Sequence, residues 1–85
     1  MTVYYFHFQS GGRLIMDPEG VELRSAADAL EVAAKLAAAL LDDGEVACDW
    51  RRSAFRVEDQ HQRRVFRLPM TTVRARENRS RALLN

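Results

Sequence analysis

One stretch of this chain has the periodicity of an α-helix, and it lies between two stretches that alternate like β-strands. The helical stretch, residues 25–42, is rich in alanine and leucine. Ser25 is a good N-cap, and Gly44 suits the position just beyond the C-terminus. A chain of 85 residues with one helix has few ways to bury every apolar face, because each face needs another element to pack against.

The first strand signal is the aromatic run at residues 3–8. Gly11 and Gly12 then permit a tight reversal, and residues 13–16 return as a short second strand. The segment 17–20, Asp-Pro-Glu-Gly, suits a type I turn that leads through residues 21–23 into the helix. Alternation separates even-numbered from odd-numbered residues of the first strand: Tyr4, Phe6 and Phe8 share one face, and Val3, Tyr5 and His7 share the other.

The glycines and carboxylates at residues 9–20 raise the question of a ligand-binding loop. A phosphate loop needs glycines that open a helix, whereas here an apolar strand follows them. A calcium loop needs regularly spaced oxygen ligands, a pattern that Asp17, Glu19 and Glu22 do not fit. The stretch is therefore interpreted as two turns.

The second strand pair is predicted after the helix. Residues 45–50 are expected to be extended, with Val46, Cys48 and Trp50 facing one way, and a bulge or loop is expected near residues 51–53. A hairpin then forms around residues 59–62. Pairing Glu58 with Arg63 places two sets of residues on opposite faces: Phe55, Val57, Phe66 and Leu68 toward the helix, and Arg56, Arg63 and Arg67 away from it.

These elements predict an α+β fold of the order ββαββ, with a single helix packed on one face of a mainly antiparallel sheet. Residues 1–70 form one domain. Residues 71–85 form a basic C-terminal tail without a clear apolar face, which is expected to be a frayed helix or disordered.

The apolar face of the helix is wider than packing on a small sheet requires. Its centre is expected to bury Leu30 among other leucines and alanines, while Val32 and Leu36 widen the apolar arc to roughly 200°. Two interpretations stay open. Either the edge of the helix tolerates apolar residues at the surface, or Val32 and Leu36 contact a second protomer.

Charge is unevenly distributed along the chain. The net charge is only +1, but residues 1–50 carry a balance of −6 and residues 51–85 a balance of +7, almost all of it from arginine. Guanidinium groups suit bidentate contacts with carboxylates or phosphates. The two halves therefore either neutralise each other within or between chains, or the arginine-rich half meets an anionic partner.

No set of residues has the spacing of an active site, so no catalytic residue, cofactor or metal is predicted. Cys48 has no second cysteine to form a zinc or redox motif, and it is interpreted as a buried structural thiol. His7 and His61 lie on different elements, the first on a sheet face and the second in a solvated turn. The chain has no apolar run long enough to span a membrane and no export signal at its start, so a cytoplasmic location is expected.

Two segments resemble a family of small bacterial proteins catalogued as a domain of unknown function, whose members open with a stretch like YFFHVRDGGRLIPDEEGVEL. The matching segments here are VYYFHFQSGGRLIMDPEGVELRSAADAL and FRVEDQHQRRVFRLPM, although DQHQ lacks the glycine usual in that hairpin. The resemblance spans roughly residues 3–70. It implies a shared fold in a soluble bacterial protein, and it supplies no activity.

Two functions are consistent with these patterns. The first is a protein-interaction module without catalytic activity that forms a homodimer, through the wide helix face or the exposed sheet. The alternative is a nucleic-acid-binding module, in which Tyr5 and His7 stack on bases while Arg56, Arg63 and Arg67 meet phosphates. The acidic first half opposes a polyanion, which favours the interaction module.

Overall fold

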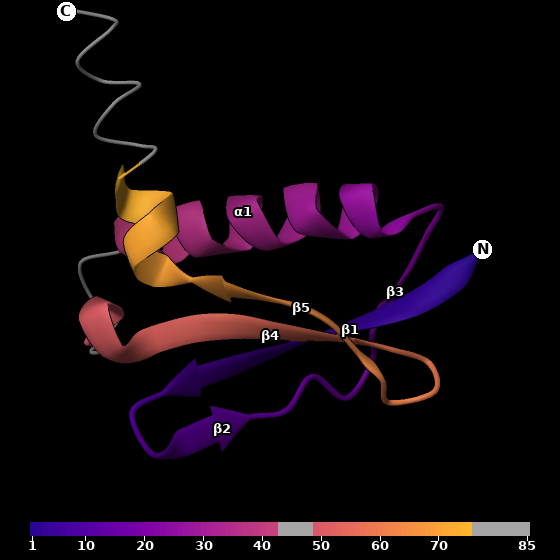
Figure 1. The fold of residues 1–85 in the computed structure, drawn as a ribbon, viewed down its shortest axis with the longest axis horizontal. Helices are drawn as coiled ribbons and strands as arrows, with labels where there is room; N and C mark the ends of the chain where they lie inside the picture. The colour runs from indigo at the N-terminus through magenta and orange to yellow at the C-terminus, as the bar shows by residue number, and fades with distance from the viewer. Residues whose placement is uncertain (43–48, 76–85) are drawn as a thin grey trace, which may run out of the picture.

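The computed structural model describes residues 1–42 and 49–75, and it confirms the α+β fold. One main helix packs on an antiparallel sheet of five strands (Figure 1). The elements in chain order are β1 (Thr2–Ser10), β2 (Arg13–Ile15), β3 (Val21–Leu23), α1 (Ala26–Asp42), a short 3-10 helix η1 (Trp50–Arg52), β4 (Ser53–Asp59) and β5 (Arg64–Pro69). Residues 70–75 are also helical.

The sheet is organised around β1, its longest strand. Its strand order is β2-β1-β4-β5, and β3 pairs with β1 on the same side as β2. The two short strands take different parts of β1: β2 pairs with Phe8–Ser10, and β3 pairs with Thr2–Tyr4. The strand β3 corrects the prediction, which treated residues 21–23 as a connection to the helix. Its backbone instead completes the pairing of the first half of β1.

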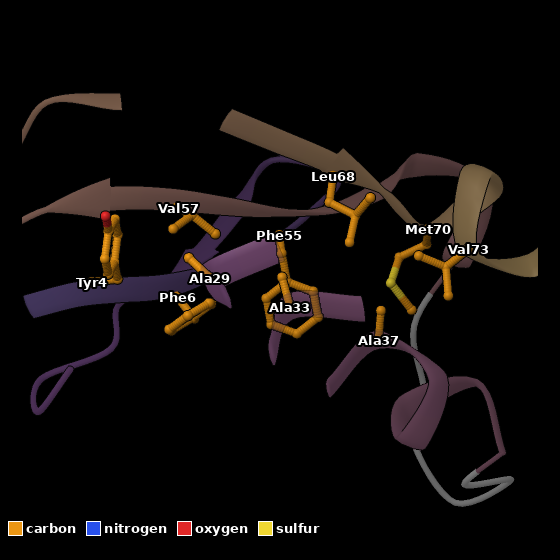
Figure 2. Close-up of a cluster of buried hydrophobic side chains, with 10 residues drawn as sticks. All are labelled: Tyr4, Phe6, Ala29, Ala33, Ala37, Phe55, Val57, Leu68, Met70 and Val73. Carbon is orange, nitrogen blue, oxygen red and sulfur yellow. The ribbon is translucent and has the colours of Figure 1, made fainter. Parts of the chain in front are cut away.

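The residues predicted to face the core from β1 and from the hairpin are confirmed. Tyr4 and Phe6 are buried with Phe55 and Val57 of β4, and Leu68 of β5 joins them in the core (Figure 2). These side chains lie between the sheet and α1. Strand alternation alone placed them there, because successive residues of a strand point to opposite faces.

The predicted register of the β4–β5 hairpin is wrong. Glu58 pairs with Arg64 rather than Arg63, and a bulge between Val57 and Glu58 then brings Val57 opposite Phe66. The turn between the strands explains the difference. Gln62 adopts a φ of 62°, a left-handed conformation that glycine usually supplies, so the reversal ends one residue later than the sequence pattern suggested.

The helix approaches the sheet through alanines. Ser25 caps it as predicted, since the Ser25 Oγ accepts a hydrogen bond from the Asp28 N–H at 3.2 Å. The fully buried positions are Ala29, Ala33 and Ala37 (Figure 2). Leu30 was predicted to lie deep in this face, but it is 41% exposed, much like Leu36 at 42%. The small side chains let the helix backbone lie close to the sheet, and both leucines are thereby left on the flanks of the contact.

The core continues beyond residue 70. Met70 and Val73 are buried against it, and the Arg74 guanidinium lies 5.0 Å from the centre of the Trp50 ring. The remainder of the predicted tail, residues 76–85, lies outside the described residues, as do Val46 and Cys48. Across the described residues, no helix has the length and hydropathy needed to cross a membrane.

Replacing Ala33 with leucine tests the close approach of the helix. Ala33 has no exposed surface, so the larger side chain must push α1 away from the sheet. We expect Ala33→Leu to lower the free energy of unfolding by about 1–3 kcal/mol, measured by urea denaturation. The matched control is Ala39→Leu on the exposed side of the same helix, which is expected to change stability by less than about 0.5 kcal/mol. Equal effects of the two substitutions would contradict this packing.

Candidate functional site

The face of the sheet opposite α1 carries an open groove of about 530 Å³, which we call the outer groove. Its floor consists of outward-facing residues of the two central strands: Tyr5 and His7 of β1, and Arg56 and Glu58 of β4. Residues from the end of β2 and the following turn line it, as do residues of the turn between β4 and β5. The outer groove therefore gathers three of the residues predicted for a ligand-binding face, namely Tyr5, His7 and Arg56.

Asp17 closes a gap in the strand pairing beside this groove. Its Oδ2 accepts a hydrogen bond from the Phe6 N–H at 3.1 Å, at a point of β1 that neither β2 nor β3 reaches. Its Oδ1 accepts from the backbone N–H groups of Glu19 at 3.1 Å and Gly20 at 3.2 Å. The carboxylate thus takes the place of a strand on one side and shapes the turn on the other.

These hydrogen bonds also set the ionisation of Asp17. Partial burial raises the pKa of this carboxyl group, but the backbone donors from Phe6, Glu19 and Gly20 outweigh that effect. The pKa therefore lies below the ordinary value of 3.8. Asp17 is ionised in the folded protein at neutral pH and acts as an acceptor only.

Gly20 lets the turn lie on the outer face of β1. It adopts a φ of +73°, and a Cβ at this position would lie 2.7 Å from Cγ1 of Val3 and 2.9 Å from Cε1 of Tyr5. Both conditions require glycine. The close approach brings the turn over the first strand, where its backbone meets the imidazole of His7.

His7 is buried although it faces away from the core, with only 4% of its surface exposed. Its Nδ1 accepts a hydrogen bond from the Asp17 N–H at 3.0 Å, and its Nε2 lies 3.4 Å from Oε1 of Glu58. The ring stacks on Tyr5, with 6.3 Å between centroids and an angle of 14°. Because Nδ1 is an acceptor here, the neutral ring carries its proton on Nε2, directed at the Glu58 carboxylate.

Glu58 joins His7 to the arginine-rich hairpin. Its Oε1 faces His7, and its Oε2 lies 3.0 Å from Nε of Arg56. The Arg56 contact is an ion pair whose angle is too poor for a hydrogen bond, since Nε has no hydrogen-bond partner. The pair is partly exposed at Arg56, whose side chain retains 35% of its surface, and largely buried at Glu58.

The chemistry of the outer groove is that of a structural brace. Both nitrogens of His7 face partners, the Glu58 carboxylate lies between two cationic or proton-bearing groups, and Asp17 accepts three backbone hydrogen bonds. His7 has no free face on which a base could stack. Over residues 1–42 and 49–75, no group of three or more His, Cys, Asp or Glu side chains is arranged to hold a metal ion.

Not all arginines of the hairpin lie on the face that was predicted for them. Arg67 pairs in register with Arg56, so the two share the outer face as predicted. Arg63 instead lies in the turn, where its N–H donates to Oδ1 of Asp59 at 3.0 Å. Arg64 takes its place on the outer face, because it pairs with the outward-facing Glu58. The bulge that displaced the register has no signal in the residue pattern.

The two helix residues predicted for an interface, Val32 and Leu36, differ in exposure. Val32 is partly buried against the core, whereas Leu36 is 42% exposed. A second apolar surface was not predicted. It lies along β2 and the start of β3, where Leu14, Ile15, Met16 and Val21 are all exposed. Three consecutive apolar residues, Leu14 to Met16, at the end of β2 are the signal that the sequence offered, since alternation would bury only one side of them.

The fold and the braced outer face together define a small α+β domain with one main helix and an open sheet. The chain belongs to the family described as a domain of unknown function (DUF6894), whose model matches residues 3–71. No curated protein matches the chain, and no solved structure matches it either. The matched region includes the Asp17 turn, the outer groove and, apart from Thr2, all five strands.

The hydrogen bonds of Asp17 generate a stability prediction. In Asp17→Asn, one of the two acceptor oxygens becomes an NH₂ donor, which then opposes a backbone N–H. We expect a loss of about 1–3 kcal/mol in the free energy of unfolding at pH 7, measured by urea denaturation. Glu19→Gln removes a neighbouring exposed carboxylate and serves as the control, with little expected change.

The pH dependence of stability in the native protein and in Asp17→Asn tests whether the ionised Asp17 carboxylate causes this difference. The folded-state pKa of Asp17 is lowered, so its contribution is present above the unfolded value of 3.8 and is lost as the pH falls through the folded value. The difference between the native protein and Asp17→Asn should therefore shrink as the pH is taken below about 4. A difference that stays constant down to acid unfolding would contradict the assignment.

Proposed function

We propose that this chain is a protein-interaction module that self-associates as a twofold homodimer and carries out no catalysis. The outer groove supports the proposed absence of catalysis. Both nitrogens of His7 and both carboxylate oxygens of Glu58 face partners within the groove, so neither side chain is a free base there. A bacterial origin and a cytoplasmic location are proposed with it, on the family resemblance and the sequence pattern.

The distribution of exposed apolar side chains carries the proposal. Seven large hydrophobic residues are exposed among those described, and four of them, Leu14, Ile15, Met16 and Val21, lie within eight residues of the chain. Scattered exposed hydrophobics need no explanation, whereas their concentration along one edge of the sheet indicates an interaction site. Of these four residues, Ile15 is the most exposed at 65%.

The mass of the protein in solution tests the proposal. We expect sedimentation equilibrium to give a species of twice 9.7 kDa as the concentration rises through the micromolar range. The association should persist when the salt concentration is raised, because apolar burial is not screened. A mass of 9.7 kDa at every concentration would refute the proposal, and dissociation by salt alone would show that the opposed charges of the two halves drive it.

We propose anion binding by the hairpin as the second candidate, on one observation. The register brings Arg56, Arg64 and Arg67 to the same face of the sheet, and the last two are exposed. Nucleic acid is the partner that a row of guanidinium groups fits, through its phosphates.

Retention on immobilised heparin, followed by binding to a labelled single-stranded oligonucleotide, tests this candidate. Three phosphate contacts predict a log–log salt slope of roughly −2 to −3, and Arg67→Gln should flatten it by about one unit or slightly less. Arg24→Gln, an exposed arginine outside the hairpin, is the control and should leave the slope unchanged. Elution below physiological salt, without a difference between the two variants, would exclude this candidate.

A further inference from the structure

We infer that β2 pairs antiparallel with β2 of a second copy across a twofold axis, so that two sheets join edge to edge. The inference rests on the proposed self-association and adds its location and geometry. It follows from three features: the direction of the backbone groups of β2, the side chains beside them, and the contrast with the opposite edge of the sheet.

The first feature is the set of free backbone groups on β2. The Phe6 N–H points to Asp17, on the side of β1 where β2 and β3 lie, and residues two apart on a strand point their N–H groups to the same side. Phe8 and Ser10 therefore form the hydrogen-bonded pairs with Ile15 and Arg13. Leu14, opposite Gln9, then has its N–H and C=O directed away from β1. Among residues 1–42 and 49–75 no strand pairs with this side of β2, so these groups are available to another strand.

The second feature is the apolar surface along this edge. Leu14 is 42% exposed and lines the outer groove, while Ile15 is 65% exposed and pairs with Phe8 on the side of the sheet that carries α1. The helix packs on β3, β4 and β5, and the exposure of Ile15 shows that it does not cover the end of β2. An added strand would cover both residues at once, one on each face.

The third feature is the contrast between the two edges of the sheet. In Figure 1, β2 and β5 are the outer strands, and no described segment lies beyond β2. On β5, Arg64, Arg67 and Pro69 are residues that prevent edge-to-edge pairing. On β2 the only charged residue is Arg13, and there is no proline until Pro18. One edge is therefore protected and the other is open.

The occupant that fits the open edge is a second copy of the same strand. With Leu14 opposite Leu14 of the copy, all three residues of β2 overlap, and the outward N–H and C=O groups of the two leucines exchange hydrogen bonds. Arg13 then lies opposite Ile15 of the copy, so that its aliphatic stem covers the exposed isoleucine and its charge does not face another arginine. The strand is complementary to itself, as a twofold contact requires.

Removing the outward donor of Leu14 tests the pairing. Leu14→Pro deletes an N–H that makes no bond to β1, whereas Leu14→Ala keeps the N–H and shortens the side chain. We expect Leu14→Pro to weaken dimerisation at least tenfold in sedimentation equilibrium, and Leu14→Ala to weaken it less. Circular dichroism and thermal melts check that each variant is folded.

Two further variants keep the test decisive if the proline variant does not fold. Ile15→Lys places a charge at the most exposed position of the edge and is expected to weaken dimerisation at least tenfold. Leu36→Glu changes the helix flank and is expected to leave it unchanged. If the native protein dimerises and the edge variants dimerise equally well, or if Leu36→Glu dissociates the dimer, the inference is overturned while the proposed function stands. A monomeric native protein overturns both.

A disulfide measures the register. In a Cys48→Ser background, Leu14→Cys places two thiols opposite each other, with Cα atoms about 5.5 Å apart in a hydrogen-bonded antiparallel pair, within the range for a disulfide. Val21→Cys, at a position that is equally exposed, is the control. We expect a covalent dimer of Leu14→Cys on oxidation and none of Val21→Cys. Cross-linking of both or of neither overturns the proposed register.

Discussion

The hydrogen bond from Phe6 to the Asp17 carboxylate is the contact on which the N-terminal half of the sheet depends. Strand β1 is nine residues long, and its partners on one side are two strands of only three residues each. The gap between them would leave a backbone N–H unpaired beside the core, at a cost of about 1–3 kcal/mol. Asp17 fills the gap with a charged acceptor and shapes the turn that joins the two short strands.

The brace on the outer face follows from that turn. Once Asp17 is held, its own N–H lies over the sheet and binds Nδ1 of His7, which directs Nε2 at Glu58. Glu58 in turn faces Arg56. The open side of this sheet has no second helix to cover it among the described residues, and this chain of contacts links its buried polar side chains to one another. The glycine and carboxylates of residues 9–20, which raised the question of a ligand-binding loop, thus have a structural role on the open face.

The sequence predicted the features that depend on local periodicity. The aromatic alternation of β1 identified its core face, and Ser25 with the alanine-rich period identified the start of α1. It failed where one segment depends on a distant one. The strand β3 has no strong propensity and forms because β1 offers it a partner. The burial of His7 depends on a turn ten residues away.

The structure differs from the prediction at two further points, and neither could be read from the residue types. The hairpin register depends on Gln62, which takes a left-handed conformation. A glycine at this position would have indicated such a turn, but glutamine does not. The depth of Leu30 was overestimated because hydrophobicity ranks leucine above alanine, whereas the closest helix–sheet contact favours the smallest side chain. For the candidate site, the sequence identified Tyr5, His7 and Arg56 but not the edge formed by β2. That edge is exposed because the helix packs on other strands, which the residue pattern does not reveal.

The protected edge at β5 has a consequence for the size of any assembly. A sheet with two open edges can add copies without limit and grow into a fibre, since each addition exposes a new edge. Here the arginines and the proline of β5 make growth in that direction unfavourable. In the proposed pairing, β2 is the one open edge that each copy contributes, so the assembly would close after two chains. The residues that give the hairpin its positive charge would then also limit the number of subunits.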